Sequence, residues 1–77
     1  MNKMDFFRMI EDVIEVLPGT ISGGTKLNEL ENWDSLSILQ FIVNVDKHFG
    51  MKLVAAQLSP CQVVDDLIGL LNGKVRE

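Results

Sequence analysis

The sequence predicts an all-α fold, a small bundle of three to four helices with a long loop between the first two main helices. Apolar residues recur at helical spacing in three segments, about residues 2–17, 35–49 and 60–71. Pro18, Gly50 and Gly73 follow these segments as helix-ending signals. Strand-like alternation is not evident outside residues 51–54. The length of 77 residues indicates one domain, which we expect to span residues 1–77.

The first segment, about residues 2–17, predicts an amphipathic helix. Its apolar stripe, expected to face the core, consists of Phe6, Phe7, Ile10, Val13, Ile14 and Leu17. Its charged stripe, expected to face water, consists of Asp5, Arg8, Glu11, Asp12 and Glu15. Pro18-Gly19 predicts the end of this helix, because proline and glycine do not continue it.

Residues 18–33 predict a long loop, whose first half is too rich in glycine, serine and threonine for a stable helix. Leu27, Leu30 and Trp33 then recur at intervals of three, and we expect them to pin the loop onto the core through a short helical turn. A loop of this length is unusual in a small domain. The function suggested for it is to deliver Ser35 to an exposed helix start.

The second helix is predicted over residues 35–49, with Gly50 as its C-terminal cap. The predicted core face consists of Ile38, Phe41, Ile42, Val45 and Phe49, with Leu39 at its margin. The predicted water-facing side consists of Ser37, Gln40, Asn44, Lys47 and His48. Leu36 and Val43 fall between the two faces, where partial core burial and contact with a partner are both open.

The last helix is predicted over residues 60–71, with Ser59 as its N-cap and Pro60 in its first turn. Its expected buried residues are Val63, Val64, Leu67, Ile68 and Leu71. Residues 55–57 in the preceding connection predict one short helical turn. Cys61 would lie at the start of the last helix, a location that could lower the pKa of its thiol.

Composition excludes several classes of function. The net charge is −4 and the basic residues are not clustered, so nucleic acid is not an expected partner. No apolar run approaches the ~20 residues of a membrane span. The one cysteine allows no internal disulfide, and charged residues interrupt the N-terminus where a signal peptide would have an apolar run, so we expect a cytoplasmic location. We also expect a monomer. The sequence suggests neither a metal site nor a nucleophile–base pair, and we expect no catalytic residues and no enzymatic activity.

Ser35 is the candidate functional residue. Asp34 stands where a helix N-cap belongs, and Ser35 follows in the first turn, among backbone N–H groups without partners inside the helix. The positive end of the helix dipole lies there and favours a phosphate joined to the hydroxyl. We therefore interpret Ser35 as an attachment point. The residues alone also allow a plain helix-start serine beside an Asp cap.

The segment Trp33-Asp34-Ser35-Leu36, opening an apolar helix that ends at Phe49-Gly50, resembles an acyl carrier protein, and the resemblance covers essentially the whole chain. It implies that Ser35 carries 4′-phosphopantetheine, installed from coenzyme A by a separate phosphopantetheinyl transferase that uses a metal ion. The thiol of this arm would hold an acyl group as a thioester. Asp34 and Leu36 match the residues that help the transferase recognise the site.

The sequence departs from fatty-acid carriers of this family, whose attachment helix is usually strongly acidic. The expected partner surface here is Leu36, Ser37, Gln40, Val43, Asn44 and Lys47. This surface suggests a dedicated carrier for acyl-loading and acyl-processing enzymes of a specialised pathway, such as polyketide or secondary metabolite biosynthesis, rather than general fatty acid biosynthesis. The alternatives are an aminoacyl or peptidyl carrier and an unmodified helical interaction module.

Overall fold

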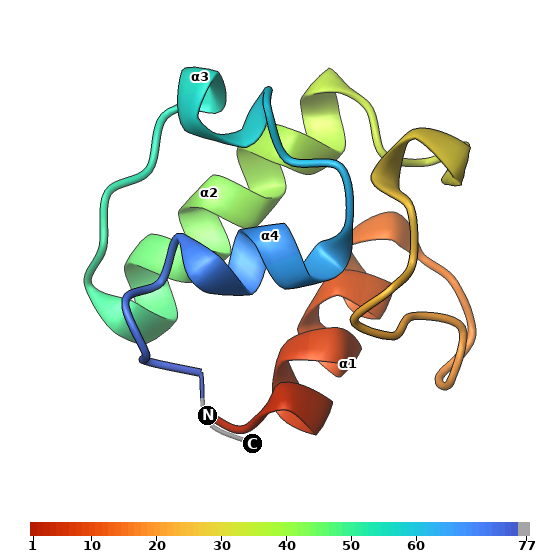
Figure 1. Cartoon of the computed structure of the whole chain (residues 1–77), viewed down its shortest axis with the longest axis horizontal. Helices are drawn as coiled ribbons and strands as arrows, with labels where there is room; N and C mark the ends of the chain where they lie inside the picture. The colour runs from red at the N-terminus through yellow and green to blue at the C-terminus, as the bar shows by residue number, and fades with distance from the viewer. Residues whose placement is uncertain (76–77) are drawn as a thin grey trace.

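The structure, a computed structural model, describes residues 1–75. It contains four α-helices and one 3₁₀ turn, which are shown in Figure 1: α1 (Lys3–Ile14), η1 (Leu27–Glu29), α2 (Ser35–Phe49), α3 (Ala55–Leu58) and α4 (Val64–Gly69). Lys26 and Val63 form an isolated antiparallel bridge, and no strand forms within the described residues. The prediction of an all-α fold with a long first connection is confirmed.

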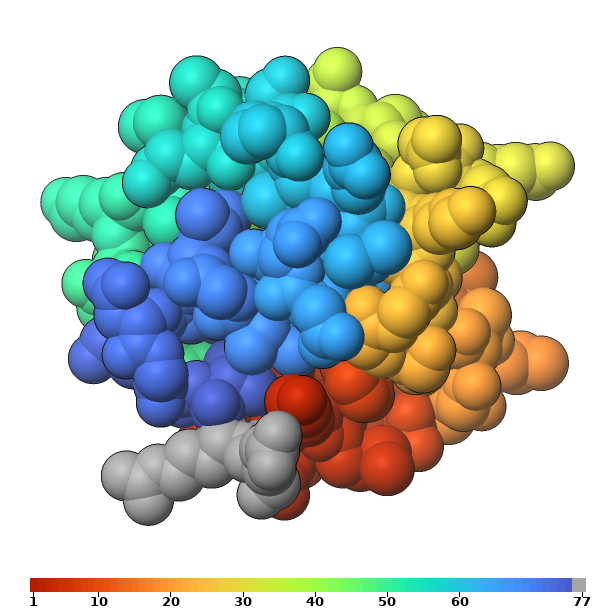
Figure 2. All heavy atoms as spheres, viewed as in Figure 1, coloured from red at the N-terminus to blue at the C-terminus, as the bar shows by residue number. Residues whose placement is uncertain are grey.

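Apolar side chains from every helix form one core. Phe6 of α1, Phe41 of α2 and Leu67 of α4 are each fully buried, and Leu58 of α3 joins the same cluster. The rings of Phe6 and Phe41 meet edge to face, with centroids 5.9 Å apart. Figure 2 shows α4 and the residues after it covering one face of the molecule, between the start of the chain and the α3 region. The core therefore lies beneath the C-terminal segment and between α1 and α2.

Helix α1 is shorter than the sequence predicts. It ends at Ile14, because Glu15 adopts the left-handed conformation with φ of 59°. Leu17 consequently lies beyond the helix and is 79 % exposed, so its assignment to the core stripe is wrong. Glu11, which was assigned to the water-facing stripe, is buried. The loop folds back over that side of the helix and covers it.

Helix α2 matches its predicted boundaries. Asp34 is the N-cap, and Gly50 ends the helix in the left-handed conformation with φ of 67°. Phe41 and Val45 are fully buried as predicted. Two assignments differ, because Leu39 is 57 % exposed and Ser37 is buried. The first turn of α2 packs against the end of the loop, which an isolated helical wheel does not include.

The predicted start of the last helix is wrong. Ser59 is the C-cap of α3, and α4 begins at Val64. Residues 62–65 are instead paired with the loop, where Leu27 N donates to the Gln62 carbonyl (2.9 Å) and Val64 N donates to the Thr25 carbonyl (3.1 Å). These hydrogen bonds and the Lys26–Val63 bridge keep residues before Val64 extended. The loop therefore sets where α4 starts.

The same junction explains a glycine in the loop. Asp65 N donates to the Gly23 carbonyl at 2.9 Å, which brings the Asp65 side chain against Gly23. A Cβ at Gly23 would lie 2.5 Å from a carboxylate oxygen of Asp65, closer than such atoms approach. A side chain at Gly23 would therefore require the Asp65 carboxylate to move.

Candidate functional site

Ser35 is the first residue of α2 and is exposed. Asp34 precedes it in an extended conformation, and the Asp34 carboxylate accepts a hydrogen bond from the backbone N–H of Ser37 at 3.0 Å. The predicted N-cap role of Asp34 is therefore confirmed. This cap fixes the direction in which the chain enters the helix, and it leaves Ser35 at the protein surface.

The Asp34 carboxyl group is held in its ionised form. The hydrogen bond from the backbone N–H of Ser37 is the largest cause of a lowered pKa at Asp34, followed by the hydrogen bond from the Ser37 hydroxyl. Together they outweigh the opposing effect of desolvation. A stable negative charge therefore lies directly beside Ser35 at neutral pH.

Ser37 is a structural residue of this site. Its hydroxyl hydrogen-bonds to the backbone carbonyl of Asn32 and lies 3.1 Å from the Asp34 carboxylate. The residue is 7 % exposed, so its predicted place on a water-facing partner surface is wrong. Its polar side chain faces inward because the end of the loop supplies a carbonyl acceptor there.

The last residues of the loop are tied to both main helices. The Asn32 side-chain amide donates to the carbonyl of Ile14, at the end of α1, at 2.9 Å. Trp33 packs edge to face on Phe41 of α2, with ring centroids 5.8 Å apart. The expectation that Trp33 anchors the loop is confirmed, and Leu27 is also buried in η1. These contacts hold the end of the loop in place directly before Ser35.

Glu11 holds the beginning of the same loop. One of its carboxylate oxygens accepts hydrogen bonds from the backbone N–H groups of Gly19 (2.8 Å) and Ile21 (3.0 Å), and the other pairs with Arg8 at 2.8 Å. Desolvation acts to raise the pKa of Glu11, but these hydrogen bonds and the charge of Arg8 outweigh it and lower the pKa. No local pattern separates Glu11 from its neighbour Asp12, so this role of Glu11 carries no signal in the sequence.

The outer face of α2 carries an apolar row that we call the α2 ridge, defined as Leu36, Leu39 and Val43. These side chains are 64 %, 57 % and 65 % exposed, which excludes burial in the core of this chain. Sequence reasoning placed Leu39 at the core margin and so missed it as a ridge residue. Beside the ridge, Gln40 is exposed and its carbonyl accepts a hydrogen bond from the half-buried Asn44 side chain at 2.8 Å.

Lys47 and His48 are exposed at the far end of α2.

Cys61 does not lie at a helix start, and burial followed by the nearby charge of Asp66 raises the pKa of its thiol. The expectation that a helix start lowers the pKa of this thiol is therefore wrong. Within residues 1–75, no group of three or more His, Cys, Asp and Glu side chains is placed to hold a metal ion. No helix in this part of the chain is long and apolar enough to cross a membrane.

Comparison with known proteins finds a likeness in structure. No protein-family model and no curated protein sequence matches the chain. The chain is similar to the solution NMR structure of a holo acyl carrier protein from Geobacter metallireducens, with a TM-score of 0.74 and 27 % sequence identity. The match covers 96 % of this chain and 86 % of that one. The chain therefore has an all-α fold of the acyl-carrier-protein type, and this likeness favours a carrier over a catalyst.

Proposed function

We propose that this protein is an acyl carrier protein, in which Ser35 bears a 4′-phosphopantetheine arm. The arm's thiol would hold an acyl group as a thioester, and the protein would present it to partner enzymes. The observation that carries the proposal is the exposed Ser35 at the first residue of α2, behind the Asp34 cap. The likeness to a holo acyl carrier protein over nearly the whole chain supports it.

The residues around Ser35 fit such a group. The 15-residue helix α2 directs the positive end of its dipole toward a phosphodiester on Ser35. The ionised Asp34 would repel that phosphate, so the phosphate would point away from Asp34 and into solvent. The same carboxylate can help to hold the metal ion of a transferase, because Mg²⁺ prefers carboxylate and phosphate oxygens. Leu36, 64 % exposed, offers that enzyme an apolar contact next to the reacting hydroxyl.

The group would supply a mobile thiol that activates an acyl chain as a thioester, and this chain would hold and present it. A phosphopantetheinyl transferase would install the arm from coenzyme A. We infer further partners among acyl-loading and acyl-processing enzymes, with the carrier acting as a monomer. A cytoplasmic location would keep the thiol of the arm reduced.

The outer face of α2 favours a specialised pathway. After Asp34 the helix contains one acidic residue, Asp46, and Gln40 and Lys47 occupy exposed positions beside the α2 ridge. This surface offers apolar contact more than negative charge, so its partners would differ from enzymes that recognise strongly acidic carriers. A polyketide or other secondary metabolite pathway fits this pattern. An aminoacyl or peptidyl carrier is the alternative.

Intact-mass measurement tests the proposal. Incubation of the purified protein with a phosphopantetheinyl transferase, Mg²⁺ and coenzyme A should add the mass of one phosphopantetheinyl group. Ser35→Ala should stay folded and unmodified, whereas the matched control Ser59→Ala, at another exposed serine, should be modified like the wild type. An unmodified wild type would instead support the unmodified interaction module. Modification of Ser35→Ala would show that another residue is the site.

The nature of the cargo needs a separate experiment. The protein isolated from its native cell should carry its cargo on Ser35 as a hydroxylamine-labile thioester. Mass spectrometry of the released group distinguishes an acyl chain from an aminoacyl or peptidyl group.

A further inference from the structure

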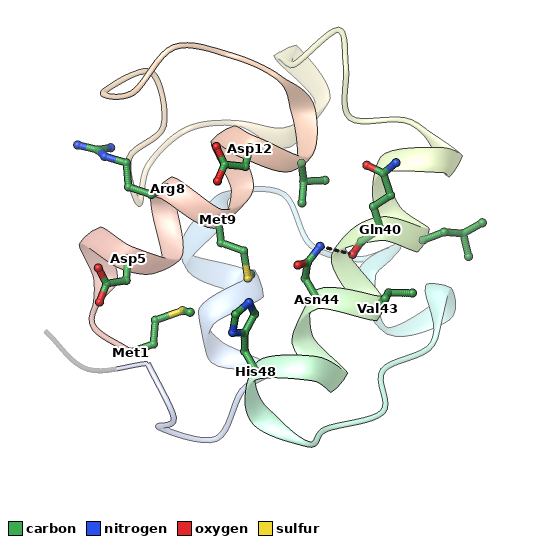
Figure 3. A pocket seen from close by; sticks show the side chains of 11 residues that line it. Met1, Asp5, Arg8, Met9, Asp12, Gln40, Val43, Asn44 and His48 are labelled. Carbon is green, nitrogen blue, oxygen red and sulfur yellow. Dashed lines mark hydrogen bonds between the residues drawn. The ribbon is translucent and has the colours of Figure 1, made fainter.

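A hollow of about 580 Å³ lies between α1 and α2, and Figure 3 shows it from close by. We call it the α1–α2 hollow. Met9, which is 8 % exposed, and the half-buried Val13 form its apolar floor on the side of α1. On the side of α2, Gln40 and Asn44 border it. Among residues 1–75, none from α3 or α4 lines this hollow.

The hollow has the dimensions of a seat for one more helix. Its lining extends over residues 5–13 of α1 and 39–48 of α2, which correspond to about 12 Å and about 14 Å along the two helix axes. In Figure 3 the pale blue ribbon of α4 lies behind α1 and α2, so α4 covers the opposite side of this pair. The groove between two packed helices accepts a row of side chains from a third helix. A helical segment of about two to three turns therefore fits the hollow.

The α1 side of the hollow is acidic. Asp5 and Asp12 are both exposed and line the hollow on either side of Met9. Arg8 lies between these two acids, but its guanidinium pairs with the buried carboxylate of Glu11 at 2.8 Å. Among residues 1–75, no salt bridge joins Asp5 or Asp12 to a basic side chain. The two carboxylates can therefore accept hydrogen bonds from basic groups of a bound partner.

This charge selects among possible occupants. A second copy of the chain matches poorly, because its net charge is −4 and none of the helices α1 to α4 carries two basic residues seven positions apart. An anionic membrane surface attracts basic segments, so an acidic wall does not favour it. A basic helix of another protein complements both the apolar floor and the acidic wall.

We propose that the α1–α2 hollow binds an amphipathic helix of a partner protein. Apolar side chains of that helix would pack on Met9 and Val13, and its basic side chains would lie beside Asp5 and Asp12. The two acids are separated by about 10 Å along α1, because they are two helical turns apart. Lys or Arg at positions i and i+7 of the partner helix would match them, with large apolar residues at i+3 and i+4 between.

This contact goes beyond the carrier function proposed above. Ser35 does not line the hollow, so the contact is separate from the proposed attachment site. It also involves α1, which the outer face of α2 does not include. A partner could therefore recognise this chain whether or not Ser35 bears a prosthetic group.

A synthetic peptide tests the proposal. The peptide is alanine-rich and about 18 residues long, so that it can form a helix. It carries leucines along one face and two lysines, spaced i and i+7, at the edge of that face. Added to the unmodified full chain, it should shift the amide NMR signals of Met9, Val13 and Gln40 and leave those of α3 and α4 unchanged. Replacing its lysines with glutamates, or its leucines with serines, should weaken binding.

Matched double variants locate the charged contact. Asp5→Asn/Asp12→Asn should weaken binding of the lysine peptide about fivefold, which corresponds to about 1 kcal/mol for two exposed ion pairs. Glu31→Gln/Asp46→Asn removes the same charge at two exposed acids outside the hollow. It should bind like the wild type at about 0.15 M salt, which screens distant charges. Asp5→Lys/Asp12→Lys should reverse the preference and bind the glutamate peptide more tightly. Circular dichroism checks that each variant stays folded.

Several results would overturn the inference. These are no shift at Met9 and Val13, equal weakening in the two neutralised double variants, or equal binding of the lysine and glutamate peptides to the wild type. If the signals of Met9 and Val13 shift when the chain alone is concentrated, a second copy occupies the hollow instead. None of these measurements involves a group on Ser35. A failure here leaves the carrier function intact, and a failure of the transferase experiment leaves this inference intact.

Discussion

The long connection before Ser35 and helix α2 after it are held in place by different forces. The connection is fixed by polar groups, with Glu11 holding its beginning and Asn32 tying its end to α1. Helix α2 is fixed by apolar burial, with Phe41 and Val45 fully enclosed. Burial determines where the helix lies because it is strong but non-directional, whereas hydrogen bonds are directional and determine how the loop enters it. The position of Ser35 requires both.

The largest loss of stability is expected from a change to the buried apolar residues of α2. Phe41→Ala should lower the free energy of unfolding by about 3–5 kcal/mol, because the ring is fully buried against Phe6 and Trp33. Urea denaturation followed by circular dichroism measures this loss. Phe49→Ala is the control on the same face, and since Phe49 is half-buried it should cost less. Equal losses would show that α2 is rotated from the position described.

The next largest loss of stability is expected from a change to the polar groups that hold the loop. Glu11→Gln removes the negative charge that accepts hydrogen bonds from two backbone N–H groups and pairs with Arg8. This change should lower the free energy of unfolding by about 1–3 kcal/mol. Amide hydrogen exchange should accelerate more at Gly19 and Ile21 than in the middle of α2. Asp12→Asn, at the neighbouring exposed acid, should change stability by less than about 0.5 kcal/mol. Similar losses in the two variants would contradict the anchoring role of Glu11.

The pH dependence of stability gives a second test of Glu11. Because its pKa in the folded protein is lower than its ordinary value of 4.5, its contribution is complete above that value and is lost as pH falls through the folded pKa. The stability difference between wild type and Glu11→Gln should therefore shrink as the pH is lowered from about 7 to about 3. Asp34 and Asp66 also have lowered pKa values, so the variant should retain part of the acid sensitivity. A constant difference would exclude the charge of Glu11 as the cause.

The junction between loop and helix should show a smaller effect. Ser37→Ala removes the hydroxyl that joins the Asn32 carbonyl to Asp34, and should cost about 1 kcal/mol. Ser35→Ala, two residues earlier at an exposed position, should cost less than about 0.5 kcal/mol. Thermal melts of both variants measure the contrast. Equal losses would mean that Ser37 does not fix the helix start.

The smallest effect is expected at the outer face of α2, which neither apolar burial nor the hydrogen bonds of the loop hold in place. Gln40→Glu/Lys47→Glu adds negative charge beside the α2 ridge, where each exposed ion pair with a partner contributes about 0–1 kcal/mol. We expect the loaded variant to turn over faster than wild type with a general fatty-acid ketosynthase. The gain should shrink as ionic strength rises, because salt screens exposed charges. If the wild type already turns over with this ketosynthase as fast as a strongly acidic carrier does, the proposal of a specialised pathway is contradicted.

The sequence by itself determined helix α2 and the position of Ser35. The apolar period, the Asp34 cap and Gly50 are signals that act within a few residues, so they can be read without knowing the fold. The same local reasoning predicted the buried Phe41 and the short turn at η1.

Only the tertiary structure decided the roles of Glu11 and Ser37 and the start of α4 at Val64. Each depends on backbone groups distant in sequence or on a loop that covers one side of a helix, and residue spacing carries no record of such pairings. Helical periodicity places a polar residue in water by default, because it cannot include the hydrogen-bond partner that makes burial favourable.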